Sequence, residues 1–478
     1  MIKKEAYFNS LKKISGVDGR HCLITLPLSD YFSEHALHKY RTLVELKHLI
    51  KMCEPEFGLP NLTEEDKKEL MAIFENFDID NASFAIAEYD HFGRNGIGPI
   101  EHDVKSVELY ISEKLKGTKY ESLLSMIHFG FTSEDVSNIA YNCMLQGAYQ
   151  NVWLPQLIRL CDKLKQLAFE NKNVPLLSRT HGQPASPTTF GKEIAVYLGR
   201  FTNQLEYLSS LKLSSKMNGA VGNYNAQKIG FPNIDWIKYS KEFVESFGFD
   251  CEFLTNQRGP KDRVVKMFQS IININIILKD LNQDFWYYVS KDLVLQKKVE
   301  SHVGSSVMPH KINPWLIECS EGNVEVSNAL FEVFARELEV SRLQRDLSDH
   351  DLERNYGAAF GYSLVALSYT NDFLELISIN DALMLNELKE NQKVLSEAYQ
   401  TIFRAKGRSD GYNVFKDIFR SNESYDSVKI DEIINALDAD DETKQQLRQV
   451  KCDNYLGYAN ELVEMAVNKY EKLRSTKN

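Results

Sequence analysis

Apolar side chains recur at helical spacing through the N-terminal part of the chain. Between Phe32 and Ile50 they keep roughly to one face, at intervals of three and four residues. Thr63 is followed by three acidic residues and then by another stretch of this kind, which is the pattern of a capped helix start. This part of the chain is therefore predicted to be helical.

The middle of the chain contains much longer helix-compatible stretches. Residues 190–213, 261–299 and 315–345 hold no proline, and residues 134–169 are interrupted by a single one. Helices of this length pack naturally as a bundle. The uncharged run 355–371 is too short and too polar to span a membrane, so we expect a helix buried inside that bundle.

The predicted fold class is all-α, and the helical stretches are separated by breaks rich in proline, glycine and polar residues, such as residues 179–187. We expect three domains. They are an N-terminal helical domain over residues 1–120, a central long-helix bundle over 121–370 and a C-terminal helical domain over 371–478.

Composition narrows the possible functions. The 478 residues carry a net charge of −11 without a clustered basic face, which argues against nucleic-acid binding. Seven widely spaced cysteines without a CxxC pair, and an N-terminus without an apolar segment, predict a reduced, cytoplasmic protein. The sequence lacks a P-loop, a strand-bounded GxGxxG, an HExxH and zinc-ligand spacing, which disfavours triphosphate, dinucleotide and metal sites.

The first candidate site is the loop Gly304–Pro314, with the sequence Gly-Ser-Ser-Val-Met-Pro-His-Lys-Ile-Asn-Pro. Asn313 before Pro314 favours a helix start, and a helix N-terminus beside Lys311 attracts a carboxylate or a phosphate. In that field a serine alkoxide is stabilised, so the serine could act as a base. A turn that simply caps a helix would have the same composition.

His181 lies in the second candidate site, the turn-rich segment Ser178–Pro184. A histidine in such a place can act as a general acid near neutral pH. An ordinary loop histidine is the alternative interpretation.

Three further segments combine charge with helix-start chemistry. Thr132–Asp135 either caps the helix that follows or holds a carboxylate on its free N–H groups. In Glu101–Glu108, His102 can pair with a nearby acid, or the segment is a solvated helix face; a metal site is disfavoured because no second ligand lies at the right spacing. Ser341–Asn355 holds three arginines and a histidine, which either bind a phosphate or form ion pairs along a helix.

Together and in this order, the segments resemble one family. Residues 304–314 are similar to the GSSxMPxKxNP signature of the fumarase/aspartase superfamily. Within that superfamily, six stretches are similar to the adenylosuccinate lyases: Val17–Arg20, His102–Lys105 with Glu108, Phe131–Asp135, Ser178–Pro184, Lys216–Ala226 and Ser341–Asp346.

The resemblance implies an all-α, fumarase/aspartase-like fold, assembled as a homotetramer whose active sites are each built from three subunits. It implies β-elimination of fumarate from adenylosuccinate, which gives AMP, and from SAICAR, which gives AICAR, in purine biosynthesis. It also implies that no cofactor and no metal take part.

The family pattern further implies individual roles. Ser305 would remove the Cβ proton, His181 would protonate the departing nitrogen, and Glu318 would orient His181. Lys311 and Asn313 would stabilise the charge that develops on the carboxylate. The remaining matches would bind substrate: Thr132, Ser133, Gln257 and Ser306 the succinyl carboxylates, His102 and Asp103 the purine and ribose or phosphate, Arg20, Arg345 and Arg354 the anionic groups, with His21, Met308 and His350 completing the set.

Some positions depart from the family pattern. His21 stands where a tyrosine is usual, Glu101 and Cys319 replace asparagines, and His350 stands where a phosphate-binding serine is usual. These departures concern the substrate contacts more than the elimination chemistry. Two alternatives stay open: another fumarate-releasing enzyme such as argininosuccinate lyase, and a catalytically silent relative kept as a structural protein.

Overall fold

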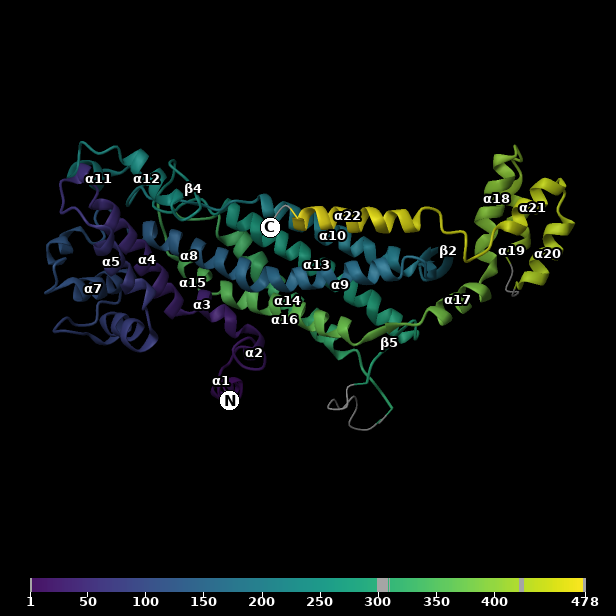
Figure 1. Cartoon of the computed structure of the whole chain (residues 1–478), viewed down its shortest axis with the longest axis horizontal. Coiled ribbons are helices and arrows are strands. Elements are labelled where there is room, and N and C mark those ends of the chain that lie inside the picture. Colours follow the sequence, from purple (N-terminus) through teal and green to yellow (C-terminus); the bar gives the residue numbers. More distant parts are fainter. Residues whose placement is uncertain (1, 299–307, 309, 421–424, 476–478) are drawn as a thin grey trace. The chain divides into compact units, whose positions relative to one another are not determined.

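The computed structural model describes residues 2–298, 308, 310–420 and 425–475 (Figure 1). The chain divides into two compact units. Unit 1 comprises Met1–Gln156, Tyr207–Asn275 and Gly322–Ala366, and unit 2 comprises Leu157–Glu206, Ile276–Glu321 and Leu367–Asn478. Five long helices contribute residues to both units: α9 (Leu154–Glu170), α10 (Phe190–Ser210), α13 (Asp262–Ser290), α14 (Trp315–Glu337) and α16 (Tyr356–Glu375).

Unit 1 is otherwise built from short and medium helices. Its α-helices are α1 (Ile2–Ser10), α2 (Cys22–Thr25), α3 (Ser29–Phe32), α4 (Glu34–Met52), α5 (Glu64–Glu75), α6 (Phe84–Ala87), α7 (Asp103–Leu115), α8 (Ser133–Ala148), α11 (Asn225–Gly230), α12 (Trp236–Glu245) and α15 (Ser348–Glu353). Tighter or wider helical turns are η1 (Leu26–Leu28), η2 (Pro55–Phe57), η3 (Ile79–Ser83), η4 (Glu88–Phe92), η5 (Glu121–Met126) and η6 (Tyr149–Trp153), and the two-residue strands β3 (Ser214–Ser215) and β4 (Asp250–Cys251) pair in parallel.

Unit 2 adds two antiparallel strand pairs and a group of short helices. The strands are β1 (Pro175–Thr180) with β2 (Gln183–Thr189), and β5 (Val294–Gln296) with β6 (Ile377–Ile379). The helices are α17 (Asp381–Glu390), η7 (Gln392–Leu395), α18 (Ser396–Ala405), α19 (Gly411–Phe419), α20 (Ser427–Ala436), α21 (Asp441–Gln449) and α22 (Ala459–Ser475). Figure 1 shows α18 to α21 gathered together, around a core that includes Tyr399, Phe403 and Phe415.

The predicted helices are largely confirmed. The stretch that begins at Phe32 is α4, and Thr63 caps α5 as expected. The Thr63 hydroxyl accepts from the Asp66 N–H at 3.2 Å, and the Asp66 carboxylate accepts from the Thr63 N–H at 2.9 Å. This reciprocal pair satisfies two N–H groups at the helix start.

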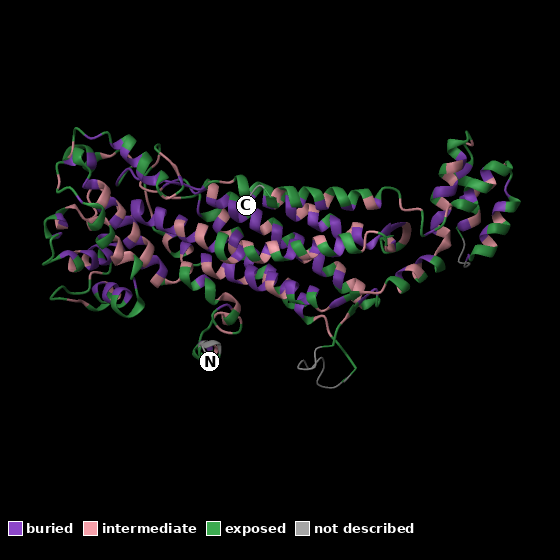
Figure 2. Ribbon diagram, in the orientation of Figure 1, coloured by how far each residue is buried: buried purple, intermediate pink, exposed green. Residues whose placement is uncertain are grey.

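The buried helix predicted over residues 355–371 is also confirmed. It is α16, in which Phe360, Val365 and Leu367 are fully buried. Figure 2 shows such buried residues along the inward faces of the long helices. Over the described residues, no helix is both long enough and apolar enough to cross a membrane.

Two of the long helices are shorter than the sequence suggested. The helix expected over 261–299 ends at Ser290, because Val294–Gln296 pair as a strand with Ile377–Ile379. The helix expected over 315–345 ends at Glu337. Beyond it the Asp346 carboxylate accepts from the N–H groups of Arg342 and Ser348, local bonds that compete with helix continuation.

The break predicted over 179–187 is a β-hairpin rather than an irregular loop. Strands β1 and β2 pair across it, with Thr180 opposite Gln183. His181 and Gly182 form the two-residue turn, and both have positive φ, at 52° and 74°. Two such residues match the twist of the flanking strands, so the turn places the histidine at the hairpin tip.

Candidate active site

A cleft of about 980 Å³ lies within unit 1. Its walls come from α4, α7, α8 and α15 and from the segments that carry Gln257 and Arg345. Eight of the predicted substrate-binding residues line it: His102, Asp103, Thr132, Ser133, Gln257, Arg345, His350 and Arg354. Segments far apart in sequence therefore meet in one cleft.

Asp103 is the centre of the charge network in this cleft. Its Oδ2 accepts from Arg41 Nη1 at 2.8 Å and from Arg354 Nη2 at 2.7 Å, and lies 3.3 Å from His350 Nε2. Burial acts to raise the pKa of Asp103, but the guanidinium groups of Arg41 and Arg354 outweigh it and hold the pKa well below its usual range. The ionised carboxylate thus fixes the side chains around it.

His350 is oriented by Arg354. Arg354 Nη1 lies 2.7 Å from His350 Nε2, and its Nε donates to Glu34 Oε1 at 2.6 Å. One ring nitrogen cannot accept from a guanidinium and donate to Asp103 at the same time. The shorter contact favours acceptance from Arg354, which places the imidazole proton on Nδ1 and leaves Asp103 held by the two arginines.

The N-terminus of α8 carries Thr132 and Ser133 into the cleft. Behind them, the Asp135 Oδ2 accepts from the N–H groups of Thr132 and Gly219 at 2.9 Å and 3.0 Å. Its Oδ1 lies 2.9 Å from Lys216 Nζ, and both charged side chains are completely buried. This buttress fixes the helix start, whose free N–H groups and dipole favour a bound anion.

His102 is exposed and caps α7. Its Nδ1 accepts from the Lys105 N–H at 3.2 Å. Glu108, which the sequence offered as a partner for His102, instead pairs with Lys105 at 2.7 Å and lies 3.8 Å from His128.

Arg345 borders the cleft with its side chain 17% exposed. Its Nη1 donates to Asp349 Oδ2 at 2.6 Å, and its Nη2 lies 3.5 Å from Glu134 Oε2. The guanidinium therefore has a solvent-facing side in the cleft and two carboxylates behind it. Its orientation is fixed before any ligand arrives.

Two predicted contacts do not line this cleft. Arg20 is exposed and His21 is half-buried, directly before α2. Burial and the charge of Arg20 lower the pKa of His21. Their place as substrate contacts stays a prediction.

The predicted chemical groups belong to unit 2. His181 is exposed at the hairpin tip, and Arg179 of the same hairpin pairs with Glu387 of α17. Glu318 accepts a hydrogen bond from Trp286 Nε1 at 3.0 Å, and the described part of the chain shows no bond between Glu318 and His181.

The remaining residues of the signature loop are partly described. Met308 and Lys311 are exposed, Asn313 is half-buried, and α14 begins at Trp315, one residue after Pro314. The predicted helix start is thus confirmed. Ser305 and Ser306 lie outside the described residues.

The sequence interpretation missed the polar face of α4. Glu34, His38 and Arg41 line the cleft. Glu45 lies one turn after Arg41, and its Oε1 is 2.5 Å from His128 Nδ1. These α4 residues recur every three or four positions, so the polar stripe was readable beside the apolar one. Arg41 is 1% exposed, which makes it a buried cation aimed at Asp103.

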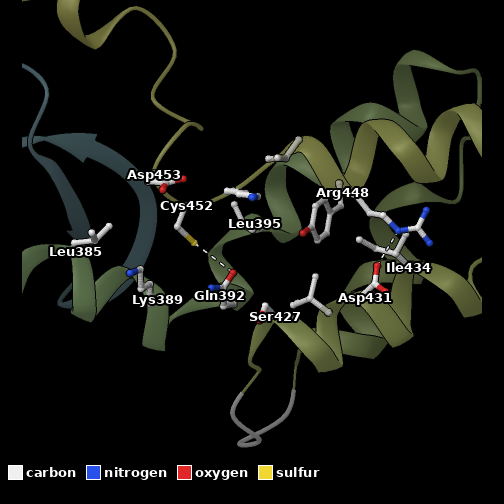
Figure 3. Close-up of a pocket in the computed structure, with 14 residues that line it drawn as sticks. Leu385, Lys389, Gln392, Leu395, Ser427, Asp431, Ile434, Arg448, Cys452 and Asp453 are labelled. Atoms are coloured by element: carbon white, nitrogen blue, oxygen red, sulfur yellow. Dashed lines mark hydrogen bonds and ion pairs between the residues drawn. The ribbon is translucent and has the colours of Figure 1, made fainter.

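A second cavity, of about 370 Å³, lies among the short helices of unit 2 (Figure 3). Leu395 and Ile434 line it together with Cys452, whose Sγ lies 3.8 Å from Gln392 Oε1. Arg448 on its rim is paired with an aspartate of α20. None of the predicted site residues lines this cavity, so the unit 1 cleft is the candidate active site.

Within the described ranges, no three His, Cys, Asp or Glu side chains are grouped so that they could hold a metal ion. Carboxylate oxygens of the cleft that could otherwise bind a metal ion are paired with guanidinium groups, as at Asp103.

Comparison with known proteins adds independent evidence. Residues 67–325 match a family described as "Lyase", and residues 341–456 match one described as "Adenylosuccinate lyase C-terminal". The adenylosuccinate lyase of Legionella pneumophila (strain Philadelphia 1) is 38% identical over 460 residues, covering 95% of this chain and 98% of the relative. The enzyme of that name from Vibrio cholerae is 37% identical, with 95% and 99% covered.

The fold has solved counterparts as well. A fumarate lyase from Mesorhizobium sp. BNC1 superimposes with a TM-score of 0.70 at 15% identity, covering 92% of this chain and 97% of that one. At this identity the likeness concerns the fold, and it confirms the all-α, fumarase/aspartase-like class.

Proposed function

This chain belongs to the adenylosuccinate lyase family of the fumarase/aspartase superfamily, and on that premise we propose that it splits adenylosuccinate into AMP and fumarate. The same elimination would convert SAICAR into AICAR and fumarate. The observation that carries the proposal is the unit 1 cleft, where eight residues of the family pattern meet around paired cations and a helix N-terminus.

The proposed reaction is a β-elimination. Ser305 takes the Cβ proton of the succinyl group, the electron pair passes into the adjacent carboxylate, the Cα–N bond breaks, and His181 gives a proton to the departing nitrogen. Lys311, Asn313 and the start of α14 would stabilise the carboxylate charge, a preorganised electrostatic contribution that is usually large. Glu318 would orient His181.

The substrate contacts follow from the charges of the cleft. Thr132 and Ser133 at the α8 N-terminus, with Gln257 and Ser306, are proposed to hold the succinyl carboxylates. Asp103 and His102 would contact the nucleotide, while Arg345, Arg354 and His350 would contact its anionic groups. Arg20, His21 and Met308 stay proposed contacts. The arginines of the cleft and the α8 N-terminus would supply the positive charge for an acidic substrate, in a cleft that also holds five carboxylates.

We also propose a homotetramer in which three subunits build each site. The support is that the eight proposed contacts that line the cleft belong to unit 1, whereas His181 and Glu318 belong to unit 2 of the chain. A cytoplasmic location fits the seven cysteines, all of which are free thiols. No cofactor or metal enters this proposal, since the substrate carboxylate accepts the charge. Three domains, over 1–120, 121–370 and 371–478, remain the proposed organisation.

One assay tests the proposal. The purified protein is incubated separately with adenylosuccinate and with argininosuccinate, and fumarate is measured over time. We expect fumarate from adenylosuccinate alone. Fumarate from argininosuccinate alone would replace the proposal by the sister reaction, and fumarate from neither would identify a catalytically silent relative.

A further inference from the structure

A buried cation stands directly behind the unit 1 cleft. Lys261, directly before α13, is 6% exposed and does not line the cleft. Its Nζ lies 2.6 Å from Glu353 Oε1 and 3.7 Å from Glu134 Oε1. Glu134 follows Ser133 in the first turn of α8 and does line the cleft. Lys261 thus connects α13, α15 and the N-terminus of α8.

The charges around Lys261 balance. Three carboxylates, those of Glu134, Asp349 and Glu353, are at most 3% exposed. Three cations face them: Lys261, Arg345, and Arg258, whose Nη1 lies 3.8 Å from Asp349. Burying unequal charge would be costly, so the loss of one cation leaves a carboxylate without compensation.

Arg345 is the member of this group that contacts both the cleft and the buried carboxylates. It borders the cleft, and its guanidinium contacts Glu134 and Asp349. Without Lys261, two cations would serve three carboxylates. The Arg345 guanidinium would then be drawn more strongly to the carboxylates and would offer less charge to a ligand in the cleft.

Two carboxylate oxygens of this group also depend on nearby positive charge. Among the described residues, Glu134 Oε1 is buried without a hydrogen-bond partner, and the charge of Lys261 Nζ faces it from 3.7 Å. Asp349 Oδ1 is likewise buried without one. Burial acts to lower the pKa of Lys261, but Glu353 and Glu134 outweigh it and raise that pKa, so the lysine stays charged.

We infer that Lys261 is a positioning residue: by neutralising Glu134 and Glu353 behind the cleft, it leaves the Arg345 guanidinium available to a substrate anion. The inference rests on the proposed function, in which Arg345 contacts an anionic group of the substrate. Lys261 itself does not touch the substrate, so its effect falls on affinity and hardly on the chemical step.

The test is a charge-balance series measured by KM and kcat for adenylosuccinate. Lys261→Met should raise KM about tenfold, equivalent to roughly 1.4 kcal/mol, while kcat changes less than about threefold. Glu353→Gln should leave KM unchanged or lower it, because the charge of Lys261 is then left to neutralise Glu134. The double variant Lys261→Met/Glu353→Gln restores the balance at two charges of each sign and should return KM to within about threefold of the parent.

Arg263→Met is the matched control. Arg263 lies two positions after Lys261 and pairs with Asp250 at 2.5 Å, so its loss removes a cation from the same segment. We expect its KM to equal that of the parent.

The outcomes separate three explanations. A rise in KM for Lys261→Met that the double variant reverses supports the inference. A lower melting temperature with unchanged KM would overturn it and leave Lys261 with a purely structural role. If Lys261→Met does not fold, the double variant decides. A double variant that folds and still shows a KM raised about tenfold or more would also overturn the inference, because charge balance alone would then not restore affinity. Arg345→Met is measured in parallel: an unchanged KM there would remove Arg345 from the proposed site, and the inference with it.

Discussion

The unit 1 cleft holds the proposed binding residues and the β1–β2 hairpin holds the proposed general acid, and the two regions are built in opposite ways. In the cleft, Asp103 and Arg345 are fixed by partners from the same unit at 2.6–2.8 Å. At the hairpin tip, His181 is exposed on a left-handed backbone. The proposed binding residues of the cleft are therefore preorganised within one unit, whereas the proposed acid is presented at a turn.

The difference shows where mutations should act. A side chain in the cleft supports both substrate and neighbouring side chains, so its loss should affect affinity and stability together. A side chain at the hairpin tip supports little of its own chain. Its loss should affect the chemical step and leave folding intact.

The largest effect is expected at the hairpin. His181→Asn should lower kcat by about 10²–10⁴-fold, because a general acid contributes that much. Asparagine tolerates the left-handed backbone, so the melting temperature should stay unchanged. Kinetics and thermal unfolding of the same preparation check both parts. A drop in melting temperature together with kcat would show that the hairpin tip is part of the folded core.

The next effect is expected at Asp103. Asp103→Asn leaves Arg41 and Arg354 facing a neutral group, and breaking a buried pair of this type costs on the order of 3 kcal/mol. Both KM and the free energy of unfolding should worsen, as measured by kinetics and urea titration. The exposed Asp351→Asn serves as control. A change in KM without a change in stability would contradict a self-supporting cleft.

A smaller, pH-dependent effect is expected at His128. Burial acts to lower its pKa, but Glu45 and Glu108 outweigh it, so the folded-state pKa lies above that of the unfolded chain. Such a group contributes stability that is full below an unfolded pKa of about 6.5 and is lost as pH rises through the folded value.

His128→Gln should therefore cost more unfolding free energy at pH 6 than at pH 9, measured by urea titration at both values. A deficit that does not shrink at the higher pH would mean that the histidine packs as a neutral group.

The smallest effect is expected at His350. Replacing it by serine removes the acceptor for Arg354 but keeps Asp103 as a partner of that arginine. A loss of one hydrogen bond, about 1 kcal/mol, should raise KM roughly fivefold. Steady-state kinetics check this. An unchanged KM would remove His350 from the substrate contacts.

The sequence predicted the helices well because their apolar periodicity is local. The capping pair of Thr63 and Asp66 and the buried α16 need no information from elsewhere in the chain. The family pattern also assigned Asp103 and Arg354 to one site, although 251 positions separate them along the chain.

Other features depend on contacts between residues far apart in the sequence or on pairing that local patterns do not show. The β1–β2 hairpin lies in a segment of prolines, serines and threonines that suggests a loop, and pairing across the turn decides otherwise. Arg41 was missed because a charged residue on an amphipathic helix usually faces solvent. Lys261 lies in the basic segment Arg258–Arg263, and its inferred role depends on Glu353, which lies 92 positions away.

The most direct test asks whether the two halves of the site come from different subunits. His181→Asn and Ser305→Ala, each inactive alone, are unfolded, mixed in equal amounts and reassembled. If three subunits build each site, some sites regain both the acid and the base, and a substantial part of the activity returns. Mixed tetramers, verified by mass, that show no more activity than either variant alone would contradict the shared site.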